Sequence, residues 1–246
     1  MKSMQEIFQR WFPGQIHQST DFHGLIAAHA PPAGKILDFG CGDNSLLSSH
    51  EILEREVWGT DFGAHPTLQR PERYRSLETD GTIPFAANTF DVVCSHMVME
   101  HVVEPVRFLG EINRVLKPGG AYIGQSIHAR HYVTWIRRGF DILPHRFVQR
   151  LVKVLYGREE HDTFPTCYRM NSRRAAARAA KTAGLEWVGW HGYPNQGYFA
   201  FSPLLFRAAV AFDWGLDKVL PGFGRIYFTL VLRKSLAAAM QAPLAA

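Results

Sequence analysis

The chain has 246 residues, of which 46% are hydrophobic and 20% charged, and its formal net charge is +5. These are ordinary values for a globular protein, and the length suits one α/β domain with insertions. The three cysteines, Cys41, Cys94 and Cys167, are dispersed and form no C-x-x-C pair, which argues against a disulfide framework and a zinc site. The N-terminal residues lack the apolar core of a signal peptide, and no run of about 18 apolar residues is long enough to cross a bilayer. We therefore expect a cytoplasmic protein.

The predicted elements alternate between strand and helix after a helical leader at 1–34, which ends in Pro31-Pro32-Ala33-Gly34. This alternation implies a parallel sheet with helices on both faces. Proline in the first turn and glycine after the last turn mark the helix that follows strand 91–95, and Ser172 caps a later alanine-rich helix. The predicted strands are 36–39, 57–60, 91–95, 121–126, 185–191 and 225–233, and the helices are 44–55, 105–116 and 172–183.

The stretch 36–47 is the most informative, because an apolar run ends in an acid and then turns on Gly40 and Gly42. Glycines at these positions let a ligand approach the backbone where the next helix begins. The stretch is not a dinucleotide fingerprint, since Ser45 stands where the last glycine or alanine is needed, and it is not a phosphate-binding loop. Asp38 would repel a diphosphate but suits a cationic ligand. The pattern is D-x-G-C-G.

Further motifs follow in order along the first half of the chain. Asp61 ends a short strand, where a carboxylate hydrogen-bonds a ribose diol. Residues 79–85 read TDGTIPF, and 88–95 read NTFDVVCS. Residues 99–102 read MEHV, and 115–120 read VLKPGG.

Taken together, these motifs resemble those of the class I S-adenosylmethionine-dependent methyltransferases that have a methyltransferase type 11-like domain. The resemblance covers residues 36 to about 127. Asn44 replaces the third glycine of the family's first motif. The resemblance implies a doubly wound, Rossmann-like sheet of seven strands in the order 3-2-1-4-5-7-6, with the last strand antiparallel. It also implies S-adenosylmethionine as cofactor, with Asp80 and Gly81 at the adenine and the His96 backbone at the methionine end. The expected cofactor-binding residues are Asp38, Gly40, Cys41, Gly42, Asp61, Phe62, Asp80, Gly81 and His96; no metal site is expected.

Methyl transfer from a sulfonium is an in-line displacement, so the protein mainly has to position the acceptor. An alcohol acceptor also needs a base to remove its proton. His128 is the first candidate, because in the family that the chain resembles the strand corresponding to 121–126 ends beside the methyl position. His101, from the E-H-V motif, and Tyr132 are further candidates. A structural role stays the alternative for each of them.

Two segments, 128–170 and 192–224, lie outside the common core and are expected to form a substrate-binding cap. Residues 128–178 alone carry a charge of +7, from eleven Arg or Lys and four Asp or Glu. This charge favours an anionic acceptor or contact with an anionic membrane surface, unless it is only a solvated face. The aromatic residues there suit an aromatic, glycan or lipid-linked acceptor.

The sequence favours methyl transfer to the oxygen of a small-molecule, glycan or lipid-linked acceptor. A nucleic-acid methyltransferase is one alternative, given the pI of 9.2. Residues 95–98, Ser-His-Met-Val, lack the P-P-(Y/F) motif of enzymes that methylate base amino groups. A non-catalytic scaffold is a second alternative, although it would not need the glycines and acids of the first motifs. A dehydrogenase is less consistent with Ser45. The oligomeric state does not follow from the sequence.

Overall fold

The computed structural model describes residues 4–43, 55–63, 65, 67–140, 165–194, 197–199 and 201–236, without the side chains of 4 and 137–140. The predicted helix 44–55, apart from its last residue, and residues 141–164 of the first predicted insertion lie outside this description, as does Asn44. The chain divides into two compact units. The helical unit comprises residues 1–18, 127–166 and 192–228, and the sheet unit comprises 19–126, 167–191 and 229–246.

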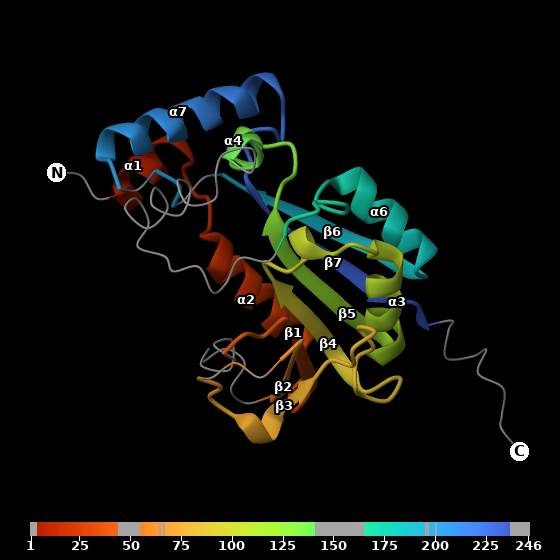
Figure 1. Cartoon of the computed structure of the whole chain (residues 1–246). Coiled ribbons are helices and arrows are strands. Elements are labelled where there is room, and N and C mark those ends of the chain that lie inside the picture. Colours follow the sequence, from red (N-terminus) through yellow and green to blue (C-terminus); the bar gives the residue numbers. More distant parts are fainter. Residues whose placement is uncertain are drawn as a thin grey trace, which may run out of the picture. The chain divides into compact units, whose positions relative to one another are not determined.

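Seven strands form one sheet in the order β3-β2-β1-β4-β5-β7-β6, which confirms the predicted order (Figure 1). β1 pairs in parallel with β2 and β4, and β4 pairs in parallel with β5. The chain therefore leaves β1 toward one side of the sheet and returns on its other side at β4. The strands are β1 (Lys35–Phe39), β2 (Glu56–Asp61), β3 (Tyr74–Ser76), β4 (Phe90–His96), β5 (Leu116–Ile127), β6 (Leu185–Tyr193) and β7 (Tyr227–Lys234).

The central strands are buried on both faces, which explains their continuous apolar sequence. On one face α2 (Gln18–His29) packs Phe22 and Ile26 against Ile36, Val92 and Ile123. On the other face α3 (Pro105–Val115) lies beside α6 (Arg173–Thr182), as Figure 1 shows. Ser172 caps α6 as predicted, because its hydroxyl accepts the N–H of Ala175.

The sheet differs from the prediction at two places. β5 begins at Leu116 rather than at 121, because Leu116 already pairs with Phe90 before a register shift that precedes the Val92–Ala121 pair. Gly119, with φ of +80°, allows the chain to pass the shift. β3 was not predicted, since its three residues follow the short helix η2 (Pro71–Arg73) and carry little strand pattern of their own.

The described part of the helical unit contains α1 (Met4–Trp11), α4 (Tyr132–Phe140) and α7 (Pro203–Val219). Phe8 and Phe12 pack against Phe206 and Val210, so α1 is held against α7. The remaining helix of the described residues is the short η3 (Met99–His101) in the sheet unit. Among the described residues, no helix is long and apolar enough to span a membrane.

Candidate active site

The turn after β1 is open on the side where a ligand would sit. Gly40 has φ of +73°, and a Cβ atom there would clash with Val98 Cγ2. Gly42 has φ of +53°, but no described residue lies within 4 Å of a Cβ placed on it. The N–H of Gly40 donates to the Thr60 carbonyl at 2.8 Å and fixes the turn to β2. Gly40 therefore serves close packing, whereas Gly42 leaves space beside the backbone.

Asp61, at the end of β2, holds this turn through its carboxylate. Oδ2 accepts the N–H of Gly42 at 3.0 Å, and Oδ1 accepts the N–H of Phe62 at 2.8 Å. Each oxygen keeps a lone pair for a further donor, such as a hydroxyl. The Phe62 ring is 68% exposed beside it. The structure thus brings together Gly42, Asp61 and Phe62, three of the predicted cofactor residues.

Asp38 lies buried below the turn, in register with Gly59 of β2 and Cys94 of β4. Burial raises the pKa of its carboxyl to about 7, and the negative charges of Asp61 and Asp43 add to the effect. The same burial, with Asp38 beside it, raises the pKa of the Cys41 thiol, which therefore stays protonated. A cation placed here would relieve the repulsion between the three acids.

Asp80 and Gly81 form a turn between β3 and β4. Asp80 accepts the Thr82 N–H and hydroxyl, each at 2.9 Å, and pairs with Arg107 of α3 at 3.1 Å. These hydrogen bonds, chiefly those from Thr82, lower the pKa of Asp80. Gly81 has φ of +85°, and no side chain or backbone atom in the described part of the chain lies within 4 Å of a Cβ placed on it. The carboxylate is charged and fixed in orientation at the surface.

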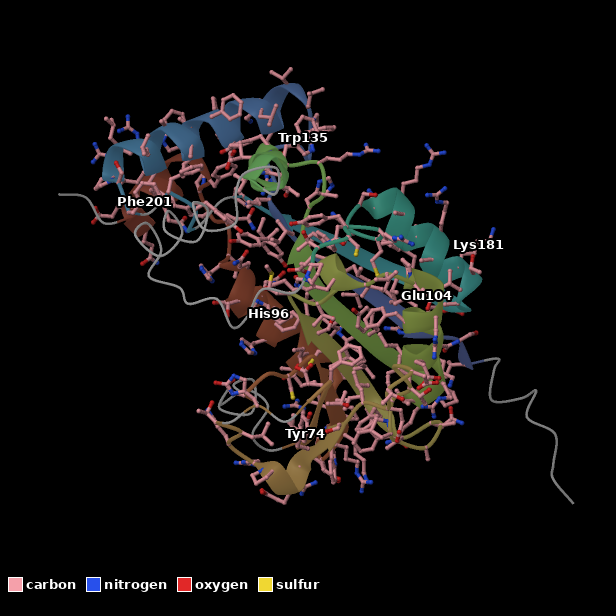
Figure 2. The ribbon with its side chains drawn as sticks, in the orientation of Figure 1. Tyr74, His96, Glu104, Trp135, Lys181 and Phe201 are labelled. Atoms are coloured by element: carbon pink, nitrogen blue, oxygen red, sulfur yellow. The ribbon has the colours of Figure 1, made fainter. Side chains whose placement is uncertain are left out.

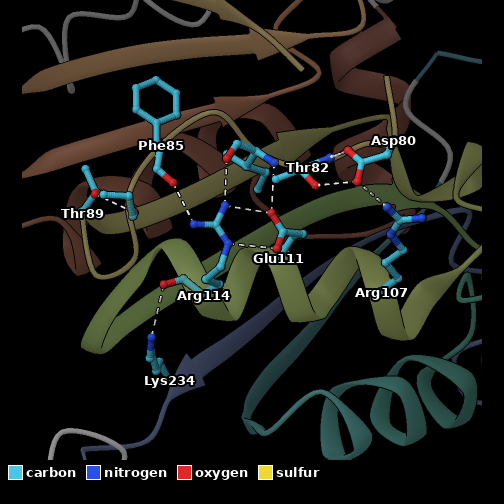
Figure 3. A network of polar contacts seen from close by, with 10 residues as sticks. Asp80, Thr82, Phe85, Thr89, Arg107, Glu111, Arg114 and Lys234 are labelled. Atoms are coloured by element: carbon cyan, nitrogen blue, oxygen red, sulfur yellow. Dashed lines mark hydrogen bonds and ion pairs between the residues drawn. The ribbon is translucent and has the colours of Figure 1, made fainter. Parts of the chain in front are cut away.

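The polar face of α3 supports this loop, a feature that sequence reasoning missed (Figure 3). Arg114 donates to the carbonyls of Ile83 and Phe85, both at 2.7 Å, and pairs with Glu111. Glu111 accepts the Ile83 N–H at 3.0 Å. The signal was present, since positions 107, 111 and 114 lie on one helical face, but only the apolar face was considered.

His96 ends β4 and is labelled in Figure 2. Its exposed ring packs against Phe22 of α2, with ring centroids 5.8 Å apart. Desolvation by the surrounding protein lowers the pKa of the imidazole, and His23 on α2 lowers it further. Met97, the next residue, has φ of +57°, and its N–H donates to the Gln125 carbonyl at 2.9 Å. Such backbone strain in a non-glycine residue is typical of functional sites.

The E-H-V motif anchors the chain at the end of β5. Glu100 is buried, its Oε2 accepts the Ser126 hydroxyl, and its carbonyl accepts the N–H groups of Cys167 and Tyr168. His101 Nε2 lies 4.0 Å from Glu100 Oε1. A structural function of Glu100 is evident from these contacts.

His128 belongs to the helical unit. Its Nδ1 accepts the N–H of Arg130 at 3.2 Å, and burial together with His131 and Arg130 lowers its pKa to about 4. Two residues on, the fully buried side chain of His131 lies 3.4 Å from Asp213 of α7. The Tyr132 ring packs against His131 and Phe212. The catalytic assignments of His128 and His101 stay predictions.

Comparison with known proteins agrees with this geometry. The model of the family "Methyltransferase domain" matches residues 37–124. A ubiquinone biosynthesis O-methyltransferase of Nitrosococcus oceani is 30% identical over 173 residues, covering 59% of this chain and 73% of that protein. The chain belongs to the class I S-adenosylmethionine-dependent methyltransferases. The UbiE ubiquinone/menaquinone biosynthesis C-methyltransferase of Desulfotalea psychrophila is 33% identical to this chain, and the match covers 42% of this chain and 46% of that protein.

Solved structures show the same fold as this methyltransferase. A S-adenosylmethionine-dependent methyltransferase of Methanosarcina mazei matches with a TM-score of 0.55 and 15% identity, covering 86% of this chain and 97% of that one. The geranyl diphosphate C-methyltransferase of Streptomyces coelicolor, solved with Mg²⁺, geranyl-S-thiolodiphosphate and S-adenosyl-L-homocysteine, matches with a TM-score of 0.55 and 18% identity. The match covers 76% of the Streptomyces chain and 88% of this one. Within the described residues of our methyltransferase, no group of three or more His, Cys, Asp or Glu side chains could hold a metal ion.

Proposed function

We propose that the methyltransferase transfers the methyl group of S-adenosylmethionine to an oxygen atom of a small-molecule or lipid-linked acceptor. The observation that carries the proposal is the proximity of Gly42, Asp61 and buried Asp38 where β1 and β2 end. Gly42 leaves room for a ligand, and the acids around Asp38 favour one that is positively charged. Both properties fit the aminoacyl end and the sulfonium of this cofactor.

Each predicted binding residue has a role in this proposal. The cofactor supplies an activated methyl group on a positively charged sulfur. Asp38 and the backbone of Gly40, Cys41 and Gly42 would hold its methionine end, together with the backbone of His96. Asp61 would accept the ribose hydroxyls beside the exposed Phe62 ring. The fixed carboxylate of Asp80 and the N–H of Gly81 would contact the adenine, which the open space around Gly81 permits.

The acceptor class is inferred from the relatives. The Nitrosococcus protein is an O-methyltransferase, and the Desulfotalea protein is a C-methyltransferase, both named for ubiquinone biosynthesis. The chain covers 73% of the first but only 46% of the second, so the substrate does not transfer directly from either. We favour a hydroxyl acceptor of small or lipid-linked type. Methyl-labelled cofactor offered with phenols, catechols, carboxylates and RNA would distinguish the acceptor classes.

Contact with a membrane surface is part of the proposal and rests on α7. Its solvent-facing side is apolar: Leu204 and Val219 are 76% and 77% exposed, and Phe212 is exposed between them. Arg207 and Lys218 flank these residues, whereas both acids of α7, which is described throughout, face inward, one buried and one paired with Arg225. Trp135 on α4 and Phe201 before α7, both labelled in Figure 2, are exposed as well. Exposed apolar side chains flanked by cations are typical of peripheral binding to anionic lipid.

The deciding experiment is calorimetric titration of the protein with S-adenosylmethionine and S-adenosylhomocysteine. Binding by the wild type, reduced at least about 10-fold in Asp61→Ala because two charge-assisted hydrogen bonds are lost, would support the proposed site. Glu72→Ala serves as the matched control, since Glu72 is an exposed acid on the short helix before β3. Absence of binding by folded wild-type protein would overturn the proposal in favour of a scaffold.

A further inference from the structure

We propose that Tyr74 is a positioning residue of the cofactor site: its hydroxyl holds Asp61 in the orientation that binds the ribose diol. This role rests on the proposed function, in which Asp61 accepts the ribose hydroxyls, and it explains what the short strand β3 does. Tyr74 is the first residue of β3 and is labelled in Figure 2. Asp61 is the last residue of β2, and both strands belong to the sheet unit.

The main-chain carbonyl of Asp61 accepts two hydrogen bonds from β3 and the residue that follows it. The Tyr74 hydroxyl donates to this carbonyl at 3.2 Å, and the N–H of Leu77 donates to it at 2.8 Å. A carbonyl oxygen has two lone pairs, so the two donors satisfy it completely. The orientation of the Asp61 carbonyl is therefore set by two residues that lie outside β2.

The carbonyl of Asp61 and the N–H of Phe62 belong to the same planar peptide unit, so rotation of that unit moves both groups together. The Phe62 N–H donates to Asp61 Oδ1 at 2.8 Å. The plane that Tyr74 holds thus also directs one carboxylate oxygen. The other oxygen, Oδ2, is fixed separately by the N–H of Gly42. Without the Tyr74 hydroxyl, the carboxylate keeps its contact with Gly42 but loses part of the restraint on Oδ1.

The Tyr74 hydroxyl has a further partner, which favours one direction for its proton. Ser76, the register partner of Asp61, donates its hydroxyl to the Tyr74 oxygen at 3.4 Å. The phenol therefore accepts from Ser76 and donates to Asp61, and bonds in such a chain strengthen one another. Burial raises the pKa of Tyr74 above its ordinary value, so the hydroxyl stays protonated at neutral pH. Because its one proton goes to Asp61, Tyr74 acts on a ligand through Asp61.

The two neighbours of Tyr74 hold β3 against β2. The guanidinium groups of Arg73 and Arg75 lie 5.2 Å and 5.5 Å from the centre of the Trp58 ring on β2, which is the geometry of cation–π contacts. The Thr60 hydroxyl donates to the Arg75 carbonyl at 2.7 Å. Since β3 has only three residues, these side-chain contacts add to its few main-chain bonds and keep Tyr74 in place.

A fixed carboxylate binds a diol more tightly than a mobile one. A ribose presents two hydroxyls, and each carboxylate oxygen of Asp61 keeps a lone pair for one of them. Binding that must first immobilise a side chain costs free energy, and a carboxylate that is already held in place avoids this cost. Loss of one neutral hydrogen bond from the support of Asp61 should therefore weaken cofactor binding about 3- to 10-fold.

The test compares two ligands by calorimetry: S-adenosylhomocysteine and its 2′,3′-dideoxy analogue, which lacks the ribose hydroxyls. The wild type should bind the analogue more weakly than S-adenosylhomocysteine. Tyr74→Phe should bind S-adenosylhomocysteine about 3- to 10-fold more weakly than the wild type does. Its affinity for the analogue should be unchanged, because the diol through which Tyr74 acts is missing. Ser76→Ala leaves the bond between Tyr74 and Asp61 in place, so it should have a smaller effect.

Two controls separate positioning from general stabilisation. Tyr122→Phe removes a hydroxyl that forms a hydrogen bond with Ser95 at 2.7 Å in the buried sheet. This variant should unfold at lower urea concentration but keep the ratio of the two affinities. In a chain that already carries Asp61→Ala, Tyr74→Phe should have no effect on affinity. Tyr74→Phe that binds both ligands like the wild type, or that weakens both equally, overturns the inference.

The two proposals fail in different ways. Folded wild-type protein that binds neither ligand refutes the proposed function. Wild-type protein that binds both ligands equally refutes the assignment of Asp61 to the ribose, and the role of Tyr74 falls with it. If the wild type prefers S-adenosylhomocysteine and Tyr74→Phe keeps that preference in full, only the role of Tyr74 is refuted.

Discussion

The N–H of Gly42 donates to Asp61 Oδ2 at 3.0 Å, so the turn after β1 and the end of β2 form one rigid corner. The N–H of Gly42 thus orients the Asp61 carboxylate, and Asp61 in turn holds the Gly40–Gly42 turn in place. The corner needs glycine for two different reasons at its two positions. Gly40 faces Val98, whereas among the described residues none lies within 4 Å of a Cβ placed on Gly42.

This difference predicts opposite outcomes for two alanine variants. Gly40→Ala should destabilise the fold by about 1–3 kcal/mol, because the methyl group meets Val98 and φ is positive. Gly42→Ala should cost only about 1 kcal/mol, from its positive φ, but should weaken cofactor binding at least about 10-fold by filling the ligand space. Urea unfolding and calorimetry with S-adenosylhomocysteine check both. Equal loss of stability with retained binding in both variants would contradict this division.

The pKa of Asp38 predicts a conflict between stability and binding. Its pKa is about 7 in the folded chain, compared with an ordinary value of 3.8. Between these pH values the folded state binds more protons than the unfolded state. The contribution of Asp38 to the free energy of unfolding therefore falls as the pH rises and is lost above pH 7. Asp38→Asn should therefore unfold with a free energy higher by on the order of 2 kcal/mol at pH 8, with a smaller gain at pH 5.

Binding should show the opposite dependence on pH. Wild-type affinity for S-adenosylmethionine should increase as the pH rises through 7, because Asp38 then carries the charge that a cation requires. Asp38→Asn should bind weakly at every pH. Calorimetry between pH 6 and 8 measures this. A wild-type affinity that does not vary with pH would contradict the assignment of Asp38 to the cationic end of the cofactor.

The sequence predicted the parts of the site that are local in the chain. Gly40, Gly42, Asp61 and Asp80 each stand in a short motif, because a strand end and its turn are consecutive residues. The hydrogen bond between Gln125 and Thr229 was not predictable in this way. Gln125 and Thr229 are 104 positions apart, and they meet only because β7 inserts beside β5 in the sheet. A strand order supplied by resemblance gives the neighbours of β5, but not which of their side chains share a hydrogen bond.

The hydrogen bonds of α3 predict that substitution by lysine changes the free energy of unfolding more at Arg114 than at Arg107. Arg114 uses its planar fork to bind the Ile83 and Phe85 carbonyls and Glu111 together, which one ammonium group cannot reproduce. Arg114→Lys should lower the free energy of unfolding by about 1–2 kcal/mol. Arg107→Lys should cost less than about 0.5 kcal/mol, because its pair with Asp80 is exposed. Denaturant unfolding monitored by circular dichroism measures both, and equal losses would contradict the argument.

The α7 surface predicts binding to anionic vesicles. Wild-type protein should sediment with phosphatidylglycerol-containing vesicles and less with pure phosphatidylcholine, because Arg207 and Lys218 flank the apolar side chains. Leu204→Glu with Val219→Glu should weaken sedimentation at least about 10-fold, since both highly exposed apolar side chains become charged. Val188→Glu, an exposed apolar position on β6 in the sheet unit, is the control and should bind normally. If vesicles do not bind the wild type, and the double variant instead dissociates a dimer in sedimentation velocity, the surface binds a second copy of the chain rather than lipid.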